Sequence, residues 1–378
     1  MGFLGDLSPE EFLRDYWQKK PLLVRQAIPG FTSPVSPDAF MDMATRDDAL
    51  VRLIIERGGE YPWQLFEGPF ERDELDAMPG DVWSMLIQEM DRMVPAVHDL
   101  WNHVSFLPNW RLDDIMVSLA SPEGGVGAHI DEYDVFLVQG WGRRRWQIGG
   151  APVSDASHIP DLDVRILESF EPKHEWIVEP GDMLYLPPRF AHYGVALDPC
   201  MTFSLGCRAP SAMEFTGALL ERALETMDPD ERYGDPDLKA ATAPGLLGSE
   251  ASAYARSVLS SLGEDGLDDL VGRVITEPRR YTEMDDAPDL RPSALRKALD
   301  GGARLYAPAP YQALYRVAEH ACILYLRGDR IELTRDMEPM IRALTSASGA
   351  YAADIPMGAD VMELLADLVS EGHLILDA

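Results

Sequence analysis

The first pattern of apolar and polar positions in the chain predicts a short amphipathic helix. Ser8 and Glu11 have the spacing of a capping box, and Pro9 suits the first helical turn. The helix should reach about Gln18 before Pro21 stops it. Its apolar face comprises Phe12, Leu13, Tyr16 and Trp17. A short strand should follow at Pro21–Val24.

Between residues 110 and 208 the pattern changes to short apolar runs that Gly and Pro interrupt. Many short strands with turns between them predict a barrel or a double-sheet roll. The expected strands are Ile115–Ala120, Val135–Gln139, Arg145–Ile148, Glu175–Val178, Met183–Leu186, Gly194–Ala196 and Thr202–Cys207.

After Pro210 the apolar residues recur at helical spacing. The first helix is marked by Phe215, Leu219, Leu220, Ala223, Leu224 and Met227. Two more helices are predicted near Ala251–Leu262 and Leu267–Ile275. This block is too thin to bury a good core alone, so we expect it to pack on the barrel or on a second subunit. Pro278 and the acidic stretch Glu283–Asp289 are typical of a linker.

The last segment, residues 287–378, predicts the order helix, strands, hairpin, helix, helix, strand. The elements are Arg291–Leu299, Ile323–Leu326, Ile331–Leu333, Met337–Leu344, Val361–Val369 and Leu374–Leu376. This order resembles a winged helix. The two later helices carry only Arg342 as a cation, so we expect them to serve interaction or assembly, not nucleic-acid binding.

Length and composition bound the class of protein. The chain has 378 residues, which favours two or three domains. It contains no apolar run long enough for a transmembrane helix, and its first residues lack the features of a signal peptide. Three cysteines make no disulfide framework, so we expect a reducing cytoplasm.

The charge is strongly acidic. The net charge is −31, from 64 acidic and 33 basic residues. Phosphate binding relies on Lys and Arg, so a direct nucleic-acid ligand is disfavoured. A basic partner would be attracted, although solubility or a salty habitat explains the same charge.

The strongest chemical signal is His129-Ile130-Asp131 with a later His192. Residues two apart on a strand point to the same side, so His129 and Asp131 can reach one metal. Two imidazoles and one carboxylate are the ligands of mononuclear non-haem Fe(II) oxygenases. Zinc bound by the same ligands and a chance surface pair are the alternatives. The glycine-rich approach at 124–127 and the turn at Pro180-Gly181-Asp182 favour a metal site in a rolled sheet.

The run Arg143-Arg144-Arg145 provides a candidate anion site. Alternation along a strand places Arg144 on the face opposite its two neighbours. An arginine directed into a β-roll needs an anion, and a dicarboxylate cosubstrate would supply one. The alternatives are a protein carboxylate as partner, or three solvated arginines at an edge.

These residues carry a resemblance to a known family. The segments Gly124–Phe136 and Gln139–Trp146 resemble the bacterial JmjC-type ribosomal oxygenases. The segment Tyr16–Leu23 is similar to their N-terminal signature, and Pro180 through His192 is similar to their second metal motif. The match covers the barrel closely, and the layout extends it over the whole chain.

The resemblance implies a fold and an activity. The fold is α+β: a double-stranded β-helix (residues 1–208), a helical dimerisation region (209–286) and a winged-helix-like domain (287–378). These enzymes use Fe(II), 2-oxoglutarate and O₂ to hydroxylate a ribosomal protein. The bacterial branch hydroxylates an arginine of ribosomal protein uL16, and human relatives hydroxylate histidine. The resemblance thus implies a basic ribosomal protein as substrate, and we expect a homodimer.

The resemblance also implies roles for single residues. His129, Asp131 and His192 would bind the metal, and Arg144 would bind the distal carboxylate of 2-oxoglutarate. Ser204, on the strand after the last ligand, would assist Arg144. Among weaker candidates are Tyr133 and Asp134, which follow the metal pair and would suit a cationic substrate side chain; turn formation and packing are their alternative roles. The remaining histidines have no ligand spacing and are expected to be structural: His98, His103, His158, His174, His320 and His373.

Three hypotheses follow for function. The first is a 2-oxoglutarate- and Fe(II)-dependent protein hydroxylase, most directly of an arginine in uL16, with histidine as the alternative target. The second is a cupin enzyme of another kind that does not depend on 2-oxoglutarate. The third is a non-catalytic module whose acidic surface binds basic partners.

Overall fold

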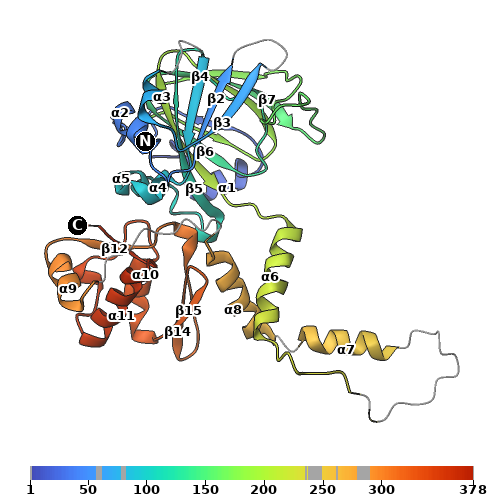
Figure 1. Cartoon of the computed structure of the whole chain (residues 1–378), viewed down its shortest axis with the longest axis vertical. Coiled ribbons are helices and arrows are strands. Elements are labelled where there is room, and N and C mark those ends of the chain that lie inside the picture. The colour runs from blue at the N-terminus through green and yellow to red at the C-terminus, as the bar shows by residue number, and fades with distance from the viewer. Residues whose placement is uncertain are drawn as a thin grey trace. The chain divides into compact units, whose positions relative to one another are not determined.

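The computed structural model describes residues 2–56, 62–77, 82–234, 236, 249–260, 263–278 and 290–377. Its internal contacts divide the chain into two compact units. The first unit combines Met1–Ala209, Arg280–Tyr311 and Pro339–Ala378, and the second combines Pro210–Arg279 with Gln312–Glu338. The elements of both units are labelled in Figure 1.

The first unit is built on an eight-stranded antiparallel sheet of order β1-β9-β6-β11-β5-β4-β2-β3. Its strands are β1 (Leu22–Val24), β2 (Val51–Glu56), β3 (Trp63–Glu67), β4 (Val82–Ile87), β5 (Leu112–Ala120), β6 (Val135–Trp141), β9 (Met183–Leu186) and β11 (Cys200–Cys207). Every residue of the central strand β11 is buried. The sheet must therefore be covered on both faces.

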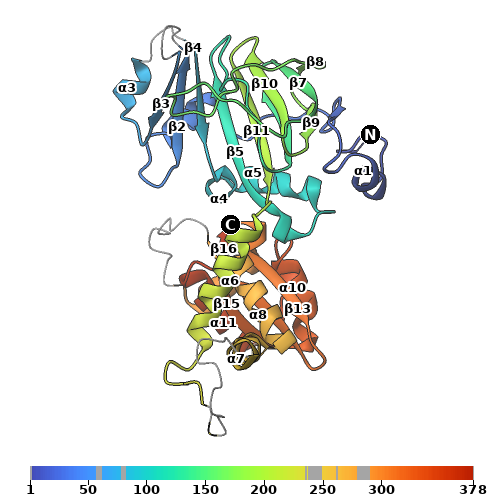
Figure 2. The ribbon, with the colours of Figure 1, turned by 90° about the vertical axis from the view of Figure 1, so that its right-hand side faces the viewer.

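A second sheet covers one of these faces. It has the order β10-β7-β8, with strands β7 (Arg144–Pro152), β8 (His174–Val178) and β10 (Phe190–Ala196). One apolar cluster joins Leu137 and Leu184 of the large sheet to Trp146 and Ile148 of the small sheet. The two sheets therefore face each other across a shared interior (Figure 2), which confirms the predicted double-sheet roll within an α+β fold.

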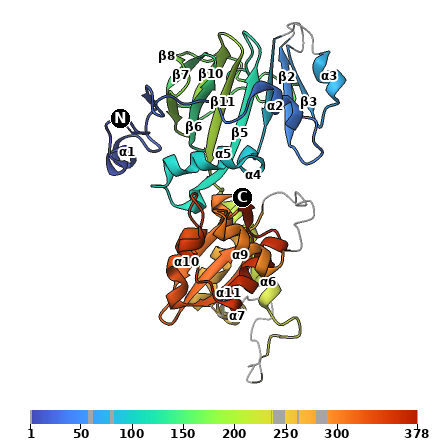
Figure 3. The same cartoon turned by 90° about the vertical axis from the view of Figure 1, so that its left-hand side faces the viewer.

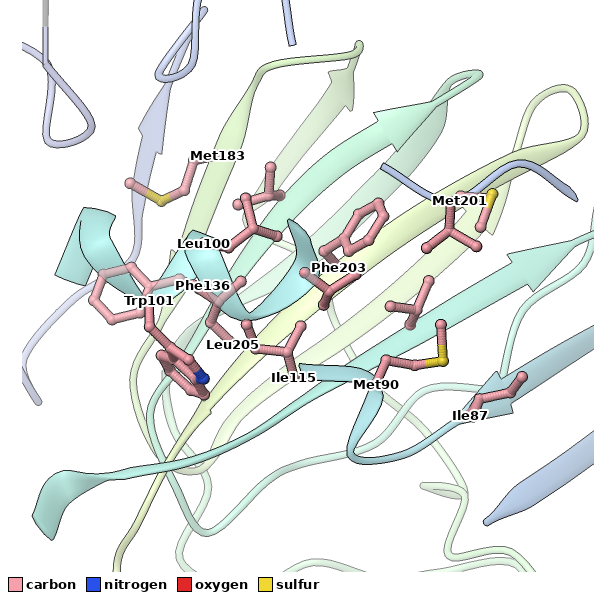
Figure 4. Packing of buried hydrophobic residues seen from close by; sticks show 14 of the residues in the cluster. Ile87, Met90, Leu100, Trp101, Ile115, Phe136, Met183, Met201, Phe203 and Leu205 are labelled. Carbon is pink, nitrogen blue, oxygen red and sulfur yellow. The ribbon is translucent and has the colours of Figure 1, made fainter. Parts of the chain in front are cut away.

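The opposite face of the large sheet is covered by short helices. These are α2 (Pro37–Met43), α4 (Met90–Met93), α5 (Pro95–His98) and the 3₁₀ segment η1 (Asp99–Val104); α3 (Arg72–Asp76) and η2 (Asn109–Arg111) complete the set. Trp101 of η1 packs with Phe136 and Phe203 in the largest core cluster (Figure 4). Phe136 and Phe203 are fully buried, and truncating such a phenylalanine to alanine costs about 3–5 kcal/mol.

The N-terminal helix α1 (Pro9–Asp15) forms as the sequence predicts. Its capping box pairs the Ser8 hydroxyl with the Glu11 main chain and the Glu11 carboxylate with the Ser8 main chain. The helix ends before the expected Gln18, which adopts a left-handed φ of 56°. The Gln18 main-chain N–H donates to the Tyr185 hydroxyl at 2.8 Å, so the turn after α1 is fixed to β9.

The second unit combines helices with a three-stranded meander. Its elements are α6 (Ala212–Thr226), α7 (Ser249–Ser260), α8 (Gly263–Thr276), β13 (Ala313–Val317), β14 (Ala321–Leu326), β15 (Asp329–Thr334) and η4 (Arg335–Met337), and the 3₁₀ segment η3 (Pro310–Gln312) precedes β13 in the chain. Asp269 of α8 accepts hydrogen bonds from Tyr325 of β14 and from Arg316 and Arg330 of the neighbouring strands. The predicted helices are confirmed, while Leu262 and the linker stretch Glu283–Asp289 lie outside the described residues.

The remaining C-terminal elements belong to the first unit by their internal contacts. Figure 3 labels α9, α10 and α11 among them. They are α9 (Pro292–Asp300), β12 (Arg304–Tyr306), α10 (Glu338–Leu344), η5 (Ala352–Asp354), α11 (Ala359–Ser370) and β16 (Ile375–Asp377). Strand β12 pairs with β16, and Arg304 bridges Asp99 and Asp377 at 2.6 and 3.0 Å. The order of elements is the predicted one. A winged-helix fold and three domains stay predictions, and the boundary at 286/287 lies outside the described residues.

Within the described ranges, no helix is both long and apolar enough to cross a bilayer.

Candidate metal centre

The candidate metal ligands come from two separate segments, and main-chain hydrogen bonds join these segments. His129 and Asp131 lie between β5 and β6, and His192 lies on β10. The expectation that His129 and Asp131 sit on a regular strand is wrong, because only His129 pairs, through an isolated bridge to His192. In that bridge each residue donates its main-chain N–H to the other's carbonyl, at 3.0 and 2.9 Å. The backbone thus places the two imidazoles side by side.

The three side chains converge as predicted. One ligand atom from each of His129, Asp131 and His192 lies within 4.8 Å of the others. The Asp131 carboxylate is 3.5 Å from Nε2 of His192 and 4.0 Å from Nε2 of His129. Through the described part of the chain, this is the one group of His, Cys, Asp and Glu with such a geometry. The triad fits a metal bound on one face with other positions open.

Hydrogen bonds to the far side of each ring leave Nε2 available. Nδ1 of His129 lies 3.0 Å from the Gly127 carbonyl, and Nδ1 of His192 lies 2.9 Å from the Phe190 carbonyl. A carbonyl can only accept, so Nδ1 carries the hydrogen in both rings. The unprotonated Nε2 atoms then point into the triad, which is how metal-binding histidines are oriented.

Burial keeps His192 neutral. Desolvation, followed by the nearby His129, lowers the pKa of His192 to about 4. Its imidazole is therefore unprotonated at neutral pH, and no proton has to leave before a metal binds.

A glycine makes the approach to His129 possible. Gly127 has a φ of 81°, a left-handed conformation that favours glycine. A Cβ at Gly127 would lie 2.7 Å from Ile166, a residue of the connection between β7 and β8. The chain next to the triad therefore packs directly against this connection.

Arg144 is buried inside the roll, as the alternation of faces predicts. Its side chain is 3% exposed, whereas Arg143 is exposed and pairs with Asp198 at 2.8 Å. Nε and Nη2 of Arg144 are buried without a hydrogen-bond partner, and its guanidinium carbon lies 5.7 Å from the centre of the Trp146 ring. Arg144 forms no ion pair with any described carboxylate. A protein partner and a solvated edge are both excluded for this residue.

Ser204 faces the same interior. It lies on β11, directly opposite Met116 of β5 and Leu137 of β6, and is 8% exposed. Its strand neighbours Phe203 and Leu205 belong to the core cluster on the other face of the sheet. Ser204 therefore points between the two sheets, where Arg144 also lies.

The structure separates Tyr133 from Asp134. Tyr133 is 41% exposed, and its pKa is raised by desolvation and by the charges of Asp131, Asp114 and Asp113. It therefore stands in an acidic environment beside the metal ligands. Asp114 was not predicted as part of this environment. It lies on β5 two residues before Met116, which is paired with Ser204, so the alternation of faces could have indicated it.

Asp134 is in a different place. Its carboxylate is fully buried and accepts hydrogen bonds from the Tyr185 hydroxyl at 2.5 Å, from Gln18 at 2.9 Å and from Arg111 at 3.3 Å. Burial raises the pKa of Asp134 despite these bonds. This network attaches the turn after α1 to the sheet. It gives Asp134 a structural role and does not support the predicted contact with substrate.

Comparisons with known proteins agree with this geometry. A family model for the JmjC domain matches residues 99–215. The Haemophilus influenzae protein named "Probable ribosomal oxygenase" is 32% identical over 98% of this chain and 93% of its own length. The Escherichia coli "Ribosomal protein uL16 3-hydroxylase" is 31% identical over 97% of both chains.

Solved structures extend the similarity to three dimensions. A crystal structure of Escherichia coli YcfD has a TM-score of 0.86 and 29% identity over 100% of both chains. A structure of YcfD in complex with cobalt and 2-oxoglutarate has a TM-score of 0.82 and 29% identity over 99% of both chains. Fold and site together define an oxygenase with the α+β JmjC/cupin fold. The chain belongs to the bacterial JmjC-type ribosomal oxygenase family, which confirms the resemblance found in the sequence.

Proposed function

We propose that the protein is an Fe(II)- and 2-oxoglutarate-dependent hydroxylase of a basic ribosomal protein, and that its target is an arginine of uL16. The observation that carries this proposal is the buried guanidinium of Arg144, without a partner, in the same interior as the His129, Asp131 and His192 triad. The similarity to a uL16 3-hydroxylase supports the choice of substrate.

The residues present suit these cofactors. His129, Asp131 and His192 would hold the Fe(II) ion, and the guanidinium of Arg144 would bind the distal carboxylate of 2-oxoglutarate. The Ser204 hydroxyl would donate to the same carboxylate. The bound iron, with 2-oxoglutarate and O₂, supplies the oxidising chemistry, while the protein orients the cosubstrate and substrate.

The surroundings of the exposed Tyr133 suit a cationic side chain. Tyr133 has the negative charges of Asp131, Asp114 and Asp113 around it, opposed only in part by Arg52. An arginine side chain placed here would meet a favourable potential and an aromatic ring. The net charge of −31 would speed the encounter with a basic ribosomal protein and disfavours direct nucleic-acid binding.

The test uses purified protein with Fe(II) and 2-oxoglutarate. Peptides that cover uL16 should gain the mass of one oxygen atom, located by fragmentation on one arginine. His192→Ala protein and an arginine-to-lysine peptide are the controls. Oxygen on a histidine would select the alternative target. No oxygen on any ribosomal peptide would contradict the proposal and favour a binding module, while hydroxylation without 2-oxoglutarate would favour another kind of cupin enzyme.

The helical region is proposed to form a homodimer. Helix α6 exposes Met213, Leu220 and Leu224, with 82%, 50% and 68% of their surfaces accessible. Covering these side chains would remove apolar area from water. We also propose the three-domain division at 208/209 and 286/287, a winged-helix-like C-terminal domain, and a cytoplasmic location beside the ribosomal substrate.

A further inference from the structure

Arg189 occupies a strained position in the turn that leads to His192. It lies between β9 and β10 after Pro187-Pro188 and has a φ of 64°. A non-glycine residue is uncommon in this left-handed region, because its Cβ crowds the main chain. Glycine would adopt this conformation with less strain, so any advantage of arginine here lies in its side chain.

The main chain of Arg189 is bonded to a metal ligand. Its N–H donates to the carbonyl of Asp131 at 2.6 Å. Its guanidinium binds the neighbouring residue, Glu132, with Nη1 at 2.8 and 3.1 Å from the two carboxylate oxygens. Because Glu132 is largely exposed, the main-chain bond is the stronger constraint on the ligand segment.

The same guanidinium holds the start of the connection between β7 and β8. Nε donates to the Val153 carbonyl and Nη2 to the Ser154 carbonyl, both at 2.6 Å, and the Val153 N–H returns a bond to the Arg189 carbonyl at 2.9 Å. Arg189 thus binds two segments that lie far apart in the sequence, one of which carries the metal ligand Asp131.

A later part of this connection is attached to the segment that carries His129. The Leu167 N–H donates to the Ala128 carbonyl at 2.8 Å, next to His129, and Ile166 packs on Gly127. Between these two attachment points the connection folds back on itself, since His158 pairs with Leu167. The connection is therefore fixed at two points to the chain that presents His129 and Asp131.

We propose that Arg189 is a positioning residue that couples metal binding to the order of residues 153–168 in the β7–β8 connection. Through its N–H it sets the place of Asp131, and through its guanidinium it attaches the connection to the same turn. Coupling of this kind is reciprocal: metal binding should order the connection, and a detached connection should weaken metal binding. The inference rests on the metal site of the proposed function.

The experiment compares wild type with Arg189→Gly, Arg189→Lys and the control Asp161→Gly. Asp161 is another left-handed non-glycine residue, with a φ of 60°, and it lies in the same connection without a side-chain bond to the ligand segments. Co(II) binding is followed by visible absorption. Order of the connection is followed by trypsin cleavage after the exposed Arg165, with and without Co(II).

In the wild type, Co(II) should slow cleavage after Arg165. Arg189→Gly keeps the main-chain bond to Asp131 but loses the guanidinium bonds that attach the connection, so by reciprocity it should bind Co(II) more weakly by at least roughly 5-fold, and Co(II) should no longer protect Arg165. Arg189→Lys should have an intermediate Co(II) affinity and intermediate protection, and Asp161→Gly should match the wild type in both. Without metal, Arg189→Gly should keep the wild-type circular dichroism, because relief of the left-handed strain offsets part of the lost side-chain hydrogen bonds.

Two results have distinct meanings. If Arg189→Gly binds Co(II) as tightly as wild type and keeps the protection of Arg165, the positioning role is wrong. If the wild type itself fails to bind Co(II), the metal site of the proposed function is wrong instead. Neither readout depends on turnover of a ribosomal substrate.

Discussion

Arg144→Met should make the free protein more stable while it abolishes cosubstrate binding. The Arg144 side chain is 3% exposed, and two of its three nitrogens are buried without a partner. Withdrawing a charge from water costs several kcal/mol, and apolar replacement of buried ionic groups is often stabilising by about 1–4 kcal/mol. At roughly 2 °C per kcal/mol for a large chain, the melting temperature without ligand should rise by about 2–8 °C.

The same substitution should remove the effect of 2-oxoglutarate. Loss of a buried charge-assisted contact costs about 2–5 kcal/mol, which corresponds to roughly 30- to 5,000-fold weaker binding. Thermal melting with Co(II), with and without 2-oxoglutarate, measures both effects. The cosubstrate should stabilise the wild type and leave Arg144→Met unchanged. Arg144→Lys keeps the charge without the planar fork, so it should show a smaller ligand shift.

Arg143→Met is the matched control. Arg143 is the adjacent arginine, exposed and paired with Asp198 at the surface, so its removal should change stability by less than about 1 kcal/mol. Its response to 2-oxoglutarate should be that of the wild type. A lower melting temperature for Arg144→Met than for the wild type without ligand would contradict the predicted cost of the buried charge, and an undiminished stabilisation by 2-oxoglutarate would contradict the cosubstrate contact.

Three further predictions concern titration and metal binding. Burial raises the pKa of Asp91 to about 7, so the contribution of Asp91 to stability should fall as pH rises from about 4 to 7, by roughly 4 kcal/mol. Burial, aided by Arg304, lowers the pKa of His98 to about 3, so the contribution of His98 should fall as pH drops below about 6.5. The two contributions oppose each other in the wild type, so urea unfolding at a series of pH values should show Asp91→Asn losing stability relative to the wild type toward acid pH and His98→Phe gaining it; a variant that runs parallel to the wild type would contradict the role of that residue. His192→Ala should abolish Co(II) absorption yet keep the wild-type circular dichroism, because its bridge to His129 is formed by the main chain.

The period of two along strands explains which parts of the site could be predicted. This alternation predicted that Arg144 lies inside the roll. It also predicts that the adjacent residues Tyr133 and Asp134 face opposite sides of the sheet. Tyr133 shares a face with Val135, which lies between the two sheets. Asp134 shares a face with Phe136, which lies in the core cluster on the other side of the large sheet. Extending the strand pattern by two residues would have assigned Asp134 correctly.

Other features left no comparable pattern. Strand β2 is buried on both faces along most of its length, so its apolar residues do not alternate, and it was not predicted. The partners of Arg189 are main-chain carbonyls and a carboxylate far away in the sequence. A carbonyl has no sequence signature, so contacts of this kind become visible only in three dimensions.

The reciprocal main-chain bonds between His129 and His192 have a consequence for which ion the site takes up. Because these bonds fix the two histidines before an ion binds, little conformational entropy is lost on metal binding. The donor set alone does not favour Fe²⁺, because nitrogen and oxygen donors hold Cu²⁺ and Zn²⁺ more tightly. Binding of Fe²⁺ would then depend on which ions are available around the protein. Excess Zn²⁺ would abolish activity by competing with Fe²⁺ for the three ligands, and the protein would stay folded.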